Sequence, residues 1–200
     1  MALGAAAIGG VAAGPALAAK LIHPKHHAKA TAQAAVTRLA PPRVPARAGN
    51  AERYVSLVNA HTDESLHAVY WRDGKYLSDT MHQVNHVLRD HLSGDVHQMD
   101  PQLIDLLNDL HQNMGTSEPF VVISGYRSPK TNALMHRTQR GVASNSMHIK
   151  GKASDIQLPG CNIDTLHNAA LALAEGGVGY YPRSGFVHVD TGKVRQWAFG

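Results

Sequence analysis

Two histidines and one aspartate are the residues whose types and spacing most directly predict chemistry in this sequence. His148 and Asp155 lie seven residues apart in the stretch SNSMHIKGKASDIQLPG, residues 144–160, with Gly151 between them. A glycine followed by the alternating residues ASDIQL predicts a turn that enters a β-strand, rather than a helix that carries both side chains. His188 lies further along the chain, in a second alternating stretch, GFVHVD.

Alternation along the two predicted strands decides which side chains can meet. Asp155 and Ile156 point to opposite faces of the first strand, whereas His188 and Asp190 share one face of the second. If the strands are neighbours, His148, Asp155 and His188 converge on one point. Two imidazoles and one carboxylate form a three-ligand zinc site that leaves a fourth position for water. Zinc lowers the pKa of such a water towards about 7, so amide hydrolysis is the natural reaction of this site.

Composition narrows the alternatives. Cys161 is the only cysteine of the 200 residues, which excludes an internal disulfide and a cysteine-rich zinc site, so any metal must lie on His, Asp or Glu. The net charge is +4, but residues 1–50 hold six of the nineteen Lys and Arg residues and none of the fifteen acidic residues. The remaining part is therefore close to neutral. A nucleic-acid-binding domain concentrates positive charge on its folded part, so we expect no nucleic-acid partner.

Three segments differ in composition. Residues 1–19 form an apolar run of small residues that contains the A-x-A pattern Ala16-Leu17-Ala18, which predicts a partial signal peptide and export to the periplasm. An uncleaved anchor is the alternative that would bring the chain to a membrane, and an Ala-rich tail is the third interpretation. Residues 20–50, rich in Ala, Pro and basic residues, predict a disordered linker. Residues 51–200 predict one folded domain.

Residues 51–200 carry the patterns of both helices and strands. Helical spacing of apolar residues predicts three helices, at about 77–92, 101–110 and 164–175. Alternation or β-branching predicts strands at 54–59, 65–71 and 120–124, and in the closing stretches VGYY and GFVHVD. Helices grouped early and strands grouped late indicate an α+β domain with an antiparallel sheet.

Three ordered motifs also carry a family resemblance. They are SGYRSPKTN, SMHIKGKASDI and GGVGYYPRSGFVHVDTGKVRQW, at residues 124–132, 146–156 and 176–197. Together they resemble the LAS-type zinc peptidases, a group that includes D-alanyl-D-alanine dipeptidases and carboxypeptidases, and they are most similar to its MepK (YcbK) murein endopeptidases. The resemblance covers about residues 51–200. It implies an LAS/hedgehog-like fold, a small antiparallel sheet flanked by helices, and a substrate among the stem peptides and cross-links of peptidoglycan.

The resemblance also implies roles for single residues. It places zinc on His148, Asp155 and His188, and it places Arg127 of SGYRS in the cleft, where a guanidinium polarises the scissile carbonyl or stabilises its oxyanion. Dipeptidase relatives carry an acidic general base three residues before the last zinc histidine, a position that is glycine here. Asp190 is then the candidate base, and a carboxylate that orients a ligand imidazole is its alternative role.

Other histidines have a simpler interpretation. His82 and His86 have the i, i+4 spacing of a zinc pair, but the glutamate of the HExxH motif is absent between them. We expect both to lie on the solvated side of their helix. His23, His26 and His27 lie in the predicted linker.

Two further functions remain open at this level. A D,D- or L,D-carboxypeptidase needs a cation that holds the free carboxylate of its substrate, and Lys150, Lys152 or Arg183 would serve. A non-catalytic wall-binding module is the other alternative, because a fold can keep a metal site without its chemistry.

Overall fold

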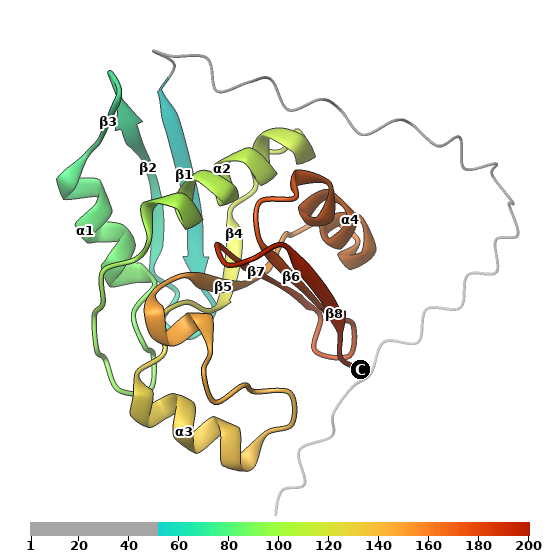
Figure 1. Ribbon diagram of the computed structural model, residues 1–200. Coiled ribbons are helices and arrows are strands. Elements are labelled where there is room, and N and C mark those ends of the chain that lie inside the picture. The colour runs from blue at the N-terminus through green and yellow to red at the C-terminus, as the bar shows by residue number, and fades with distance from the viewer. Residues whose placement is uncertain (1–51) are drawn as a thin grey trace, which may run out of the picture. The chain divides into compact units, whose positions relative to one another are not determined.

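The structure, a computed structural model, describes residues 52–200 (Figure 1). The predictions for residues 1–19 and 20–50 lie outside the described residues. Within the described part, none of the helices combines the length and the apolar character needed to cross a bilayer.

One sheet forms the framework of the described domain. Its eight strands follow the order β3-β2-β1-β4-β5-β7-β6-β8. The strands are β1 (Arg53–Asn59), β2 (Ser65–Arg72), β3 (Lys75–Tyr76), β4 (Phe120–Ser124), β5 (Ala153–Gln157), β6 (Gly177–Tyr181), β7 (Phe186–Asp190) and β8 (Arg195–Ala198). The predicted α+β class is confirmed, and so is each of the predicted strands.

Helices fill the long connections between the strands. They are α1 (Ser78–Val87), α2 (Pro101–Met114), α3 (Pro129–Thr138), the short 3-10 helix η1 (Met147–Lys150) and α4 (Ile163–Leu173). Helix α2 begins as its sequence predicts, because the Asp100 side chain accepts a hydrogen bond from the Gln102 backbone and Pro101 occupies the first turn. Helix α3 was not predicted, although Ser128 and Pro129 give the same signal at its start.

The sheet is larger and more mixed than the sequence indicated. Strand β1 pairs with β4 in parallel, and β6 pairs with β8 in parallel, whereas the other pairs are antiparallel. Parallel pairs require a long connection between their strands. The segment between β1 and β4, which contains α1 and α2, is such a connection. The sequence did not indicate the parallel pairing, because alternation within a strand carries no information about which strand becomes its neighbour.

Helix α1 is shorter than its apolar spacing predicted. It ends at Val87, and the backbone carbonyl of Leu88 accepts a hydrogen bond from the Tyr126 N–H at 2.7 Å. Residue 125 must be glycine here, because a Cβ atom would lie 2.4 Å from the Leu88 carbonyl oxygen. The end of α1 is therefore set by the loop that packs on it, 38 residues further along the chain.

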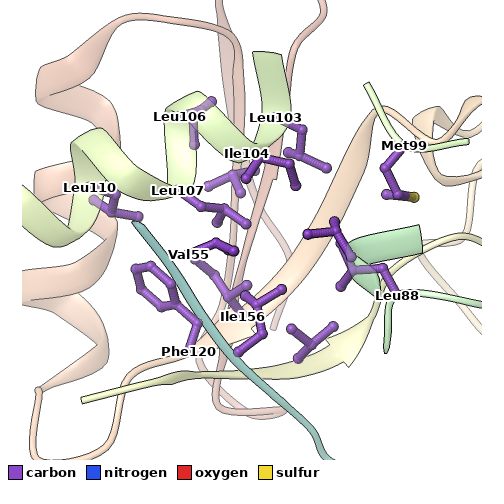
Figure 2. Close-up of a cluster of buried hydrophobic side chains, with 14 of the residues drawn as sticks. Val55, Leu88, Met99, Leu103, Ile104, Leu106, Leu107, Leu110, Phe120 and Ile156 are labelled. Atoms are coloured by element: carbon purple, nitrogen blue, oxygen red, sulfur yellow. The ribbon is translucent and has the colours of Figure 1, made fainter. Parts of the chain in front are cut away.

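The apolar core lies between helix α2 and one face of the sheet. Figure 2 shows the α2 side chains, among them Leu103 and Leu107, directed towards Val55, Phe120 and Ile156 of three strands. All five side chains are almost completely buried. Because successive strand residues point to opposite faces, this packing commits the neighbours of Ile156 to the other face.

We expect Leu107→Ala to lower the free energy of unfolding by about 2–5 kcal/mol, because the substitution removes buried methyl groups and leaves a cavity. Leu134→Ala is the matched control, since Leu134 lies on α3 and is 48% exposed. We expect this control to change the free energy of unfolding by less than about 0.5 kcal/mol. Urea unfolding followed by circular dichroism measures both, and equal effects would contradict the assignment of the core to α2.

Candidate metal centre

Three elements bring His148, Asp155 and His188 together. Asp155 on β5 and His188 on β7 are direct partners in the antiparallel register. His148 lies in η1, which Gly151 ends in a left-handed conformation (φ 64°) before β5 begins. A Cβ atom at residue 151 would also lie 2.6 Å from the Gln98 carbonyl oxygen. The glycine is therefore needed for the turn that places His148 over the start of the strand.

The three side chains meet closely and are buried. His188 Nδ1 lies 2.8 Å from Asp155 Oδ1, and His148 Nε2 lies 3.3 Å from the same oxygen. The two ring nitrogens are 3.1 Å apart. Among the described residues this is the group of His, Cys, Asp or Glu side chains whose arrangement fits a metal ion, with one ligand atom of each residue within 4.8 Å of the others.

The outer nitrogen of each ring has its own partner. His148 Nδ1 lies 2.7 Å from the Gly125 carbonyl oxygen, and because a carbonyl only accepts, this nitrogen carries the proton. His148 Nε2 therefore offers a lone pair to the cluster. His188 Nε2 lies 3.0 Å from Asp190 Oδ2, which leaves His188 Nδ1 as the nitrogen that faces the cluster. Such outer hydrogen bonds fix the ring orientation and tautomer of metal ligands.

Asp190 lies behind His188, away from the cluster. Its side chain is fully buried, and Arg195 donates to both carboxylate oxygens, at 3.0 and 2.7 Å. The Gly192 backbone N–H adds a third hydrogen bond at 2.8 Å. Although burial opposes it, hydrogen bonds with His188 and Arg195 hold the pKa of Asp190 well below its usual range. Of the two roles open to Asp190, this geometry is that of a carboxylate that orients a ligand imidazole.

Arg127 lies on the other side of the cluster, beside Asp155. Its Nη2 atom is 3.7 Å from Asp155 Oδ2 and donates to Ser124 Oγ at 3.1 Å. Its Nη1 atom donates to Asn132 Oδ1 at 3.3 Å. Arg127 is only 6% exposed, and these hydrogen bonds hold its guanidinium in one position next to the cluster.

Opposing charges set the pKa values within the cluster. Burial alone would raise the pKa of Asp155, but the imidazoles of His148 and His188 hold it well below its usual range. Burial lowers the pKa of His148. Burial would also lower the pKa of His188, but its hydrogen bonds with Asp155 and Asp190 raise it to about 8. The cluster therefore combines the ionised carboxylate of Asp155 with the neutral imidazole of His148, and it favours positive charge.

The cluster lies in the wall of a cavity of about 650 Å³. His61 and His91 line the same cavity and stack with their ring centroids 3.7 Å apart. Among the described residues that line it, Asp155 is the only acidic one. Lys150, Lys152 and Arg183, which the sequence suggested for holding a substrate carboxylate, do not line this cavity.

The remaining sequence candidates lie elsewhere. His82 and His86 are exposed on α1, as expected, and His86 Nε2 lies 3.2 Å from Glu64 Oε1. His23, His26 and His27 lie outside the described residues.

Sequence reasoning missed Asp90, which positions the loop of Arg127. Asp90 is 1% exposed and accepts hydrogen bonds from the backbone N–H groups of Leu92 and Ser128, both at 2.9 Å. The first contact is a local turn that the sequence DHLSG permits. The second spans 38 residues, and no sequence pattern indicates it.

The donor set fits a catalytic metal ion. Two ring nitrogens and one carboxylate oxygen face a common point, and the outer nitrogens of both rings are already engaged. Metal-dependent hydrolases typically have three protein ligands beside a cavity, which leaves a further position on the metal for water or substrate.

Comparison with known proteins defines the family. The family model described as Peptidoglycan L,D-endopeptidase MepK matches residues 47–197. The chain is 42% identical over 145 residues to the Peptidoglycan L,D-endopeptidase MepK of Escherichia coli (strain K12). The matched residues cover 72% of this chain and 80% of that protein. It is 40% identical over 146 residues to the Probable peptidoglycan L,D-endopeptidase MepK of Haemophilus influenzae, covering 72% and 78%. The chain therefore belongs to the MepK family of peptidases, and the resemblance drawn from its three motifs is confirmed.

We expect Asp90→Asn to lower the free energy of unfolding at pH 7 by about 1.5–3 kcal/mol, because hydrogen bonds to a charged acceptor are lost. Although burial opposes it, hydrogen bonds from Thr131 and Ser128 hold the pKa of Asp90 well below its usual range. The stabilisation is thus present above the pKa of the unfolded state, about 3.9, and is lost as the pH falls.

Urea unfolding at pH 7 and at pH 3.5 tests this expectation. The difference in the free energy of unfolding between the unmodified chain and Asp90→Asn should be smaller at pH 3.5 than at pH 7. Asp95→Asn is the control, because Asp95 lies on the same loop and is exposed. A difference that is independent of pH would show that the charge of Asp90 contributes nothing.

Proposed function

We propose that this chain is a zinc-dependent murein endopeptidase that hydrolyses peptide cross-links in peptidoglycan. The observation that carries the proposal is the buried cluster of His148, Asp155 and His188 in the wall of a large cavity. The relatives named as peptidoglycan L,D-endopeptidases support the substrate class. The expected periplasmic location, which would bring enzyme and substrate together, remains a prediction from the A-x-A pattern.

Zinc bound by these three ligands would activate a water molecule and polarise the scissile carbonyl. The chain's own residues prepare the site for this chemistry. The Gly125 carbonyl and Asp190 hold the two imidazoles with their free nitrogens towards the metal. Arg127, fixed by Ser124 and Asn132, directs a positive charge to the place where the oxyanion develops. Because the guanidinium is preorganised and buried, it stabilises that charge without reorganisation.

Asp190 acts in this proposal as a positioning residue. Its two oxygens are engaged by Arg195 and by His188 Nε2, on the side of the imidazole that faces away from the cluster. A general base must reach the water that is activated at the metal. Asp190 therefore orients His188 and balances its charge, and the acceptor of the water's proton is another group.

We expect His148→Ala, Asp155→Ala and His188→Ala each to abolish stoichiometric zinc binding and cleavage, because each removes one of three ligands. Isothermal titration with zinc measures binding, and mass analysis of muropeptides released from purified peptidoglycan measures cleavage. His82→Ala is the matched control, since His82 is exposed and lies outside the cavity. Retained zinc-dependent cleavage in any of the three variants would remove that residue from the metal site.

The products of the unmodified chain test the reaction itself. Conversion of cross-linked dimers to monomers with zinc, and its loss with a chelator, is the expected result. Loss of terminal residues from stem peptides while the dimers persist would assign a carboxypeptidase instead. Peptidoglycan that binds the chain without any conversion would assign a non-catalytic wall-binding module.

Asp190→Asn separates positioning from base catalysis. We expect it to weaken zinc affinity about 10- to 100-fold, because the outer hydrogen bond of a ligand imidazole loses its charged acceptor. Activity should return when zinc is raised to saturation. A loss of turnover that persists at saturating zinc, with unchanged zinc affinity, would instead make Asp190 the base. Circular dichroism confirms that the variant is folded.

A further inference from the structure

The arginines that line the cavity differ in their interaction partners. Arg127 is paired with Asp155 and bound to Ser124 and Asn132, as described above. Arg195 forms a two-pronged ion pair with Asp190. Arg140 also lines the cavity, but its exposed side chain has no hydrogen bond or ion pair within residues 52–200. Among the cavity-lining arginines of the described residues, Arg140 is therefore the one that forms no ion pair with an acidic side chain.

The loop that carries Arg140 is held in place although the side chain is not. This loop, residues 139–146, follows α3. Asn132 Nδ2 donates to the Ala143 carbonyl at 3.0 Å and to the Ser144 carbonyl at 3.3 Å. His136 Nδ1 donates to the Val142 carbonyl at 2.6 Å. The same Asn132 side chain contacts Arg127, so the backbone beside Arg140 is tied to the metal centre.

A charge without a counterpart in a preorganised wall indicates an anionic ligand. Asp155 is the only acidic residue among the described residues that line the cavity, and it belongs to the metal cluster. An anion in this cavity would therefore meet little repulsion. Guanidinium groups bind carboxylates through two parallel hydrogen bonds, which gives geometric selectivity as well as attraction.

We propose that Arg140 binds a carboxylate of the stem peptide that occupies the cavity, and that it selects free carboxyl over carboxamide. The inference rests on the proposed function and adds a specificity residue to it. In stem peptides whose diamino acid residue has two carboxyl groups, one of these groups lies outside the peptide chain, and it is the chemical feature that Arg140 would recognise. This contact differs from the one that the sequence suggested for Lys150, Lys152 or Arg183, which concerned the free C-terminal carboxylate of a carboxypeptidase substrate.

The test uses two cross-linked muropeptide dimers that differ only in whether their diamino acid carboxyl groups are free or amidated. We expect Arg140→Ala to lower kcat/KM for the free-carboxyl dimer about 10- to 100-fold, mainly through KM, because a charge-assisted contact in substrate binding is lost. For the amidated dimer the variant should match the unmodified chain. Arg140→Lys should recover part of the preference, since it keeps the charge without the planar fork.

Arg137→Ala is the matched control, because Arg137 is exposed on α3 next to this loop and does not line the cavity. It should retain the full preference for the free carboxyl group. If the unmodified chain cleaves both dimers, an equal loss of kcat/KM on both in Arg140→Ala would overturn the role of Arg140. No loss of kcat/KM on either dimer would overturn it as well. Absence of zinc-dependent cleavage by the unmodified chain would overturn the proposed function, and the role of Arg140 with it.

Discussion

The antiparallel pairing of β5 with β7 is the constraint on which the rest of the structure depends. Its register places Asp155 opposite His188 and Ile156 opposite Val187. Because successive residues of a strand point to opposite faces, one pairing builds the metal centre on one face and the core on the other. A shift of either strand by one residue would turn its own ligand side chain, Asp155 on β5 or His188 on β7, into the core. Packing against α2 therefore fixes the geometry of the centre.

Around that pairing, buried polar side chains hold the loops that complete the site. Asp90 ties the segment after α1 to the start of α3, and Asn132 joins Arg127 to the loop that carries Arg140. Among the described residues, no buried side-chain nitrogen or oxygen lacks a hydrogen-bond partner. Loops supply most of the cavity wall, and satisfied polar contacts of this kind give loops the rigidity that a functional site requires.

Charge is distributed unevenly across the site. Asp155 and Asp190 flank His188, so the cluster attracts a cation, while Arg195 offsets the carboxylate on its outer side. The cavity beyond the cluster carries arginines and histidines without further acidic residues in the described lining. A positively charged wall around a cation-binding centre suits a peptide substrate that carries carboxylates, since the two kinds of charge are complementary.

The sequence by itself determined which residues share a face. Alternation in ASDIQ and FVHVD placed Asp155, His188 and Asp190 apart from Ile156 and the valines, because strand geometry has a period of two residues. It also indicated the start of α2 and the α+β class. Only the tertiary structure decided that β1 and β4 are parallel, that Asp190 faces Arg195, and that Arg140 borders the cavity. These features depend on contacts between residues distant in the chain, and local propensity carries no information about such contacts.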